Sequence, residues 1–195
     1  MNISNSPSFF LSLALVAAVG AGFTAGNLGN SGDSMDSGLE WQNQITIEKN
    51  SEQVDRFYNT LTDQGKKYIA GKLFNSSANN ALHTSNNFTY IALGNGSDVE
   101  TEHSVLKSEI KDYGLSRAKA ATISSGSLGT YKLEKKFTAD LSSGPDNIII
   151  NTTGLNYEST GETLISGGNF TSATLKDGDE ITVTHEITIE EGSSP

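Results

Sequence analysis

Apolar and polar residues alternate over much of the chain after residue 87, and this period of two predicts β-strands. The clearest run is Glu180–Glu190, where isoleucine, valine and one histidine alternate with threonine and glutamate. Thr130–Ala139 alternates in the same way. Asn147–Asn151 instead holds three consecutive isoleucines, which is typical of a strand buried on both faces. Glycine-rich turns separate these runs, so the pattern predicts an antiparallel sandwich.

Shorter apolar runs predict the remaining strands. Lys176–Asp179 has the composition of a turn that leads into the last strand. The alternation directs the aromatic side chains of Phe88, Tyr90, Tyr131 and Phe137 toward the interior. The additional strands are expected at Leu39–Ile47, Phe88–Leu93, Ala118–Ile123, Thr163–Ser166 and Phe170–Leu175.

Three segments show helical spacing instead. Asn50 or Ser51 is suited to cap a helix whose apolar positions are Val54, Phe57, Tyr58 and Leu61. Thr62 and Asp63 are suited to begin a second helix that ends near Phe74, and Thr101–Ile110 has the spacing of a third. We therefore expect a helical hairpin at residues 50–74 that covers one face or one end of the sheets.

The first 26 residues differ in character from the rest of the chain. Phe9–Gly26 is an 18-residue apolar run without a charged side chain. Four interpretations stay open: a secretory signal, a membrane anchor, a strand donated to the open sheet of a neighbouring subunit, and a buried local helix. Residues 27–38 have the composition of a flexible linker, and residues 39–195 form the expected β-sandwich domain. The predicted fold is thus a mainly β, jelly-roll-like antiparallel sandwich with a short helical hairpin and an apolar N-terminal extension.

The amino-acid composition limits the classes of partner that the chain can bind and the chemistry that it can perform. The chain has 13 basic and 23 acidic side chains, a net charge of −10, which phosphate backbones would repel. We therefore expect no nucleic-acid partner, and contact with a membrane only through the N-terminal segment. The chain has no cysteine, which excludes disulfides, zinc–thiolate sites, iron–sulfur clusters and thiol catalysis.

Only three histidines, His83, His103 and His185, remain for acid–base or metal chemistry. His185 lies on the apolar face of the final strand and is expected to be a partly buried, hydrogen-bonded residue at a sheet margin. The sequence has no metalloprotease, serine-hydrolase or phosphate-loop spacing. We therefore expect a protein that is not an enzyme and requires no cofactor, with a hydrolase dependent on His185 as the least favoured alternative.

Acidic residues offer the best case for a metal. Calcium binds carboxylates and carbonyl oxygens carried on flexible loops, and two glycine-containing turns here are acidic. Neither turn has the spacing of an EF-hand loop. The candidate calcium ligands are Asp98, Glu100, Glu102, Asp177 and Asp179.

Sequons for N-glycosylation recur in and beside the predicted turns. Their acceptor role depends on export of the chain. The candidate sites in the β region are Asn75, Asn87, Asn95, Asn151 and Asn169.

Three groups of short motifs follow one another between residues 61 and 189. They are Leu61–Gly65 with Ile69-Ala70; Tyr90–Ser97 followed by Leu106 and Glu109-Ile110; and Gly154-Leu155 followed by Gly161–Leu164 and Leu175–Thr184. Together they resemble the motifs of tail-fibre-like structural proteins of tailed phages and related archaeal viruses. The resemblance implies a β-rich structural module of a virion or surface appendage. Two features depart from the family pattern: Thr153 stands where an acid is usual, and the apolar N-terminal run is additional. The second departure favours an exported or membrane-associated appendage.

The sequence therefore predicts a structural subunit that self-assembles into an extracellular filament or virion appendage, on the cell surface or in a virion, with strand donation between subunits as one route of assembly. The expected partners are copies of the same chain, together with cell-surface or virion components. The alternative is a surface adhesin or carbohydrate-binding module. The residues expected to mediate assembly are Phe9, Phe10, Leu11, Leu13, Leu15, Val16, Val19, Phe23, Trp41, Ile45 and Ile47.

Overall fold

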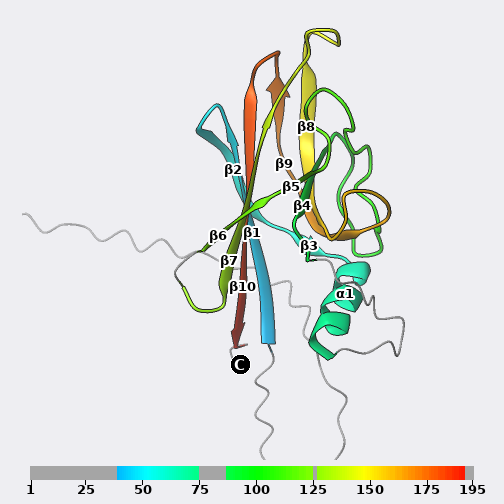
Figure 1. Cartoon of the computed structure of the whole chain (residues 1–195), viewed down its shortest axis with the longest axis vertical. Coiled ribbons are helices and arrows are strands. Elements are labelled where there is room, and N and C mark those ends of the chain that lie inside the picture. The colour runs from blue at the N-terminus through cyan, green and yellow to red at the C-terminus, as the bar shows by residue number, and fades with distance from the viewer. Residues whose placement is uncertain (1–38, 75–86, 125–126, 192–195) are drawn as a thin grey trace, which may run out of the picture. The chain divides into compact units, whose positions relative to one another are not determined.

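The computed structural model describes residues 39–74, 87–124 and 127–191, and strands make up 52% of it. Two five-stranded antiparallel sheets and one helix are present in these residues (Figure 1). Sheet A has the strand order β2-β1-β10-β7-β6, and sheet B has the order β3-β9-β8-β4-β5. The elements are β1 (Leu39–Lys49), β2 (Glu52–Tyr58), β3 (Thr60–Leu61), α1 (Asp63–Phe74), β4 (Tyr90–Gly94), β5 (Ala118–Lys119), β6 (Ala121–Ser124), β7 (Thr130–Thr138), β8 (Ile148–Asn156), β9 (Leu164–Leu175) and β10 (Glu180–Glu191).

The hydrophobic core gathers side chains from both sheets. In β10, the inward positions Ile181, Val183 and Ile187 are buried, as the alternation of this strand predicts. Sheet B contributes buried residues from β4, β8 and β9, among them Ile91 and Ile150. The predicted mainly β class is confirmed, and the two antiparallel sheets are consistent with a β-sandwich. Trp41–Glu190 forms one compact unit, and the description below concerns this unit.

The first half of the predicted helical hairpin is wrong. Lys49 pairs with Glu52 across a two-residue turn in which Asn50 and Ser51 have φ angles of 50° and 68°. Positive φ at both central residues is the geometry of a type I′ hairpin turn, whose twist matches that of paired strands. The chain therefore folds back as strand β2 instead of entering a helix. The β-branched and aromatic residues at Val54, Phe57 and Tyr58 suit a strand equally well.

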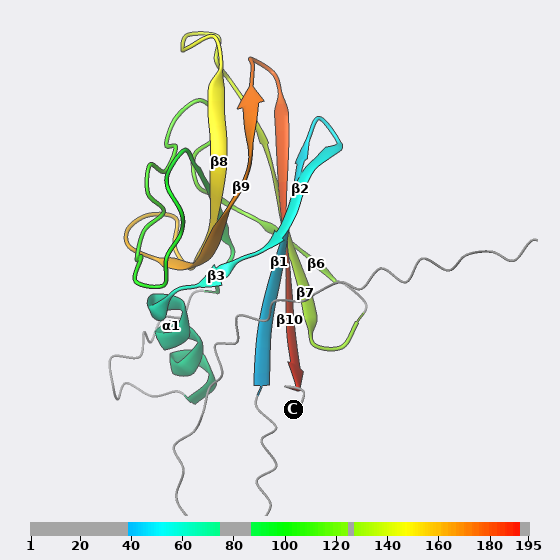
Figure 2. The same ribbon diagram turned by 180° about the vertical axis from the view of Figure 1, so that it is seen from behind.

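The second predicted helix is confirmed as α1. Thr62 caps it, because its Oγ1 accepts a hydrogen bond from Gly65 N at 3.0 Å. The helix packs closely on β9: a Cβ atom added to Gly65 would lie 2.1 Å from the Ile165 carbonyl oxygen. In addition, the ring of Tyr68 on the helix stacks on the ring of Tyr157, the residue that follows β8, with ring centroids 4.8 Å apart. The helix is thereby fixed against sheet B (Figure 2).

Four other predictions need correction. Thr101–Ile110 is not helical but forms turns and an isolated bridge between Gly94 and Glu109. The strand expected at Ala118–Ile123 is divided into β5 and β6, which belong to different sheets. The two strands expected between residues 163 and 175 are one long strand, β9. Ile149 is 44% exposed, so the isoleucine run is buried on one face only.

The chain passes between the sheets on both sides of the structure. On one side, β2 of sheet A leads through Asn59 to β3 of sheet B. On the other side, β5 of sheet B leads through Ala120 to β6 of sheet A. Figures 1 and 2 both show β1, β7 and β10 continuing past the strands of sheet B at one end. Part of the inner face of sheet A therefore has no opposing strand among the described residues.

Candidate functional site

The outermost strands of the two sheets differ in how well they are protected against pairing with another chain. β3 and β5 have two residues each, and short edge strands resist added pairing. β2 is charged and fastened to β9, because Asp55 Oδ2 accepts a hydrogen bond from Thr171 N at 2.7 Å. This hydrogen bond lowers the pKa of the Asp55 carboxyl below its ordinary value. The edge at β2 is thus guarded.

β6 forms an unguarded edge. It pairs with β7 from Ala121 opposite Glu134 to Ser124 opposite Tyr131. On its other side, it makes no backbone–backbone hydrogen bond to any residue that the structure describes. No charged residue or proline occurs between Lys119 and Lys132, so β6 lacks the usual protection of an edge strand.

An apolar surface lies at the end of sheet A next to this edge; we call it the apolar rim and define it as Leu128, Tyr131 and Ile189. Leu128 is fully exposed, Tyr131 is 63% exposed and Ile189 is 47% exposed. Ile189 N donates a hydrogen bond to Gly129 O at 3.1 Å, which joins the start of β7 to the end of β10. The prediction that Tyr131 points into the core is wrong, because it lies near the uncovered end of sheet A.

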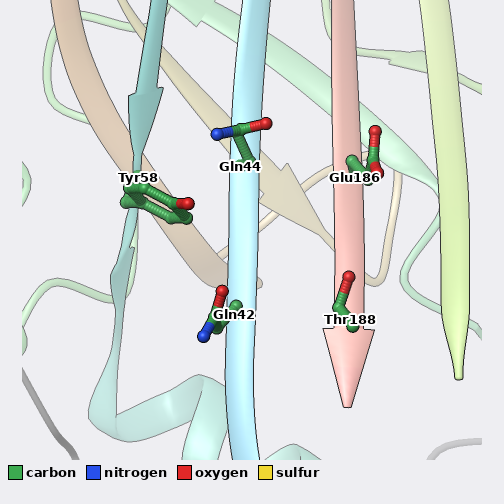
Figure 3. Close-up of a pocket in the computed structure, with 5 residues that line it drawn as sticks. All are labelled: Gln42, Gln44, Tyr58, Glu186 and Thr188. Carbon is green, nitrogen blue, oxygen red and sulfur yellow. The ribbon is translucent and has the colours of Figure 1, made fainter. Parts of the chain in front are cut away.

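The outer face of sheet A is polar and contains a shallow depression of about 140 Å³. Figure 3 shows its lining from β1, β2 and β10. Gln44 Oε1 accepts hydrogen bonds from both Nε (2.6 Å) and Nη2 of Arg56, and Glu186 forms an ion pair with Lys132 at 2.8 Å. These polar groups therefore already have protein partners. The lining residues are Gln42, Gln44, Tyr58, Glu186 and Thr188.

His185 is completely buried on a central strand of sheet A, not at a sheet margin as predicted. Its Nδ1 lies 3.1 Å from Asn43 Nδ2, which also donates to Ser166 Oγ at 3.3 Å. Burial lowers the pKa of His185 to about 3, so the imidazole is neutral at pH 7. A substrate has no access to this side chain. Of the other two histidines, His103 lies in the loop after β4 and His83 lies outside the described residues.

The candidate calcium ligands do not come together. Among residues 39–74, 87–124 and 127–191, no three acidic or histidine side chains are arranged to hold a metal ion. Asp177 Oδ1 accepts a hydrogen bond from Leu141 N at 2.7 Å. Hydrogen bonds from Asn50 Nδ2 and Lys176 N, with the Lys49 ammonium 3.0 Å away, hold the pKa of the Asp179 carboxyl well below its usual range. Asp177 and Asp179 thus accept hydrogen bonds from backbone N–H groups and hold this turn in place. On the other turn, the three candidate acids are Asp98, Glu100 and Glu102, and all three are exposed.

The five candidate glycosylation sites differ in accessibility. Asn87 and Asn95 are exposed. Asn151 and Asn169 are half-buried, and Asn151 Nδ2, the atom that would carry the glycan, donates a hydrogen bond to Gly96 O at 3.1 Å. Asn75 lies outside the described residues. The structure therefore favours Asn87 and Asn95 as acceptors.

The predicted assembly residues fall into two groups. Trp41, Ile45 and Ile47 belong to β1, and the two isoleucines are completely buried in the protein's own core. The prediction that β1 residues pair with a neighbouring subunit is therefore wrong, because β1 is an inner strand of its own sheet. The remaining candidates lie outside the described residues; they are Phe9, Phe10, Leu11, Leu13, Leu15, Val16, Val19 and Phe23.

The ion pair between Arg117 and Glu109 was not predicted from the sequence. Its two side chains are only 5% and 11% exposed, and Arg117 also reaches the loop that joins β8 to β9. The only signal in the sequence is an arginine and a glutamate eight residues apart, a spacing that predicts no contact. The contact depends on how the loop between β4 and β5 folds.

Comparison of the chain with protein-family models, with curated proteins and with solved structures found no match. The resemblance to tail-fibre-like proteins therefore stays a prediction. Within the described residues, no helix combines the length and the apolarity that crossing a bilayer requires.

Proposed function

We propose that this chain is a non-enzymatic structural subunit that self-assembles into an extracellular filament or virion appendage. The observation that carries the proposal is the difference between the two edges of sheet A. β2 is charged and fastened to β9 through Asp55, whereas β6 is uncharged and unpaired on its outer side within the described residues. If a different segment of a neighbouring copy occupies this edge, subunits join head to tail, and a head-to-tail contact that does not close generates a filament.

The apolar rim supports the same proposal. Leu128, Tyr131 and Ile189 are exposed near the start of β7 and the end of β10, in a protein whose net charge is −10. Such a patch next to an open edge is suited to a protein partner, because backbone pairing and apolar burial then act together. Exposed acceptor positions at Asn87 and Asn95 fit a chain that is exported. The jelly-roll-like topology and the tail-fibre-like resemblance are further parts of the proposal.

Sedimentation velocity of the full-length chain over a hundredfold range of concentration tests this function. We expect species that grow with concentration, and filaments of uniform width in negative-stain images of the same samples. Mass spectrometry of the assembled material shows whether residues 1–26 are retained. A single monomeric species at every concentration, with the N-terminal segment intact, would contradict self-assembly.

One observation favours carbohydrate binding as a second function. Tyr58 is 59% exposed on a polar sheet face and lines the depression in Figure 3. An exposed aromatic ring offers a stacking surface for the apolar face of a sugar.

Glycan-array binding of the purified chain tests this second function. We expect Tyr58→Ala to abolish any signal, because the stacking surface is lost. Tyr113→Ala is the control, since Tyr113 is 37% exposed, lies in the loop between β4 and β5, and does not line the depression. An array without signal for the unmodified chain removes the second function and leaves the first untouched.

A further inference from the structure

We propose that β6, together with the apolar rim, receives the segment Phe9–Phe23 of a second copy of this chain as an added strand of sheet A. The inference rests on the proposed function and names its acceptor surface and its donor segment. The acceptor is made of Ala121, Thr122 and Ile123 on β6, with Leu128, Tyr131 and Ile189 beside it.

The sequence of the donor segment has the period of a strand. Its odd-numbered positions carry most of the large apolar residues, whereas its even-numbered positions are mainly alanine, glycine and serine, with Phe10 and Val16 as the exceptions. In an extended strand, residues two apart share one face, so this pattern gives one face of large apolar side chains and one face of mainly small side chains. In a helix, residues two apart lie about 200° from each other, and the same side chains would be scattered around the axis. The large residues on the common face are Phe9, Leu11, Leu13, Leu15, Val19 and Phe23.

The donor and the acceptor match in polarity. No charged side chain occurs in residues 1–32 or between Lys119 and Lys132, so pairing the two would bury no charge. β6 exposes the side chains of Ala121, Thr122 and Ile123, which are small or apolar, and no described strand pairs with its outer edge. The bulky face of the donor then has the exposed rim side chains Leu128 and Tyr131 as apolar partners. At the opposite edge, Glu52, Asp55 and Arg56 of β2 would oppose such a segment.

Geometry favours a second copy over the same chain as the donor. β10 and β7 separate β1 from β6, a distance of about 14 Å at the usual strand spacing. The 12-residue linker, residues 27–38, spans at most about 40 Å, so length alone permits both arrangements. Within one chain, however, this polar linker would have to cross the ends of β10 and β7, where the apolar rim lies. A donor from a second copy leaves the rim available for apolar contacts.

A pair of matched charge substitutions in the full-length chain tests the acceptor. Thr122→Lys places a lysine on β6, and Gln53→Lys places one at an equally exposed position on the guarded edge, β2. We expect Thr122→Lys to shift the sedimentation profile to the monomer, because lysine on an edge opposes pairing, and Gln53→Lys to assemble like the unmodified chain. Equal far-UV circular dichroism and equal melting temperatures of the two variants establish that both are folded.

Cysteine pairing identifies the donor, and the cysteine-free chain suits this experiment. One tagged chain carries Leu11→Cys, Leu13→Cys or Leu15→Cys, and a second chain with a different tag carries Thr122→Cys. After mixing with oxidised glutathione, we expect a disulfide between differently tagged chains for one of the three donor positions, because the bond requires Cα atoms within about 7 Å. A disulfide only within a single chain that carries both cysteines, or none in any combination, would overturn the inference.

The outcomes separate this inference from the proposed function. If the unmodified chain assembles and Thr122→Lys assembles equally well, the acceptor is wrong although self-assembly stands. If the unmodified chain never assembles, both the inference and the proposed function are wrong.

Discussion

The guanidinium group of Arg117 binds both carboxylate oxygens of Glu109, with Nε–Oε1 at 2.8 Å and Nη2–Oε2 at 2.6 Å. The remaining nitrogen, Nη1, donates to Thr163 Oγ1 at 2.8 Å and to the carbonyl oxygen of Glu158 at 3.2 Å. One side chain therefore fastens the loop after β4 to the loop between β8 and β9. The loop after β4 begins within the segment Tyr90–Ser97, one of the motifs of the sequence analysis.

Removing one partner of this pair is expected to destabilise the fold strongly. Arg117→Ala leaves the Glu109 carboxylate almost fully buried without its partner, which costs about 3–5 kcal/mol of unfolding free energy. Urea denaturation measures the loss. Lys136→Ala is the control, because the Lys136–Glu180 pair is more than a third exposed on both sides and should contribute less than about 1 kcal/mol. Equal effects of the two substitutions would show that burial does not govern these ion pairs.

His185 is expected to make stability depend on pH between 7 and 5. Its pKa is about 3 in the folded protein and near 6.5 in an unfolded chain, so the unfolded chain takes up a proton first. The stability is therefore complete above pH 6.5 and declines as the pH falls toward 3, by about 2 kcal/mol at pH 5. The carboxyls of Asp55 and Asp179 titrate below 3.8 and do not contribute in this window.

Urea titrations at pH 7 and pH 5 measure this effect against His185→Gln. Glutamine keeps a donor and an acceptor near Asn43 but does not titrate. We expect the variant to be less stable than the parent at pH 7 and to lose much less between the two pH values. Parallel losses in parent and variant would contradict the assignment to His185.

Ser51 offers a way to stabilise the protein. Its φ of 68° lies in the region that glycine occupies without steric cost, so Ser51→Gly should raise the unfolding free energy by about 0.5–1 kcal/mol. Asn50→Gly is the matched control at the neighbouring positive φ. Asn50 Nδ2 donates to Asp179 Oδ1 at 3.0 Å and its Oδ1 accepts from Glu180 N at 2.9 Å, so this change should destabilise. Thermal melts compare the two variants, and a gain from both would show that the side-chain bonds of Asn50 are unimportant.

The sequence predicts those parts of the fold that depend on local patterns. The alternation in β10 and β7 identifies the buried faces, since Val183 and Leu133 are both buried. Thr62 likewise signals the start of α1, where its Oγ1 accepts a hydrogen bond from Gly65 N. In each case, the cause lies within a few residues of the signal.

One failure has a local cause: Val54 and Phe57 fit a helix or a strand, and the type I′ turn at Asn50-Ser51 decides between them. The other failures concern features that depend on distant parts of the chain. Tyr131 has the inward parity of its strand, but its exposure depends on how far sheet B extends. The Arg117–Glu109 pair and the open edge of β6 likewise follow from tertiary arrangement. Local periodicity carries no information about either.

Hydrogen–deuterium exchange on β6 is the most direct test of whether another chain covers its edge. Successive N–H groups of a strand point to opposite sides, so of Thr122 and Ile123 one amide faces β7 and the other faces the open edge. Our account predicts that exchange of the edge-facing amide in the full-length protein slows as protein concentration rises, and that Leu13→Asp together with Leu15→Asp in the same chain restores fast exchange at every concentration. An exchange rate at this amide that is unaffected by concentration and by the paired aspartate substitutions would contradict the account.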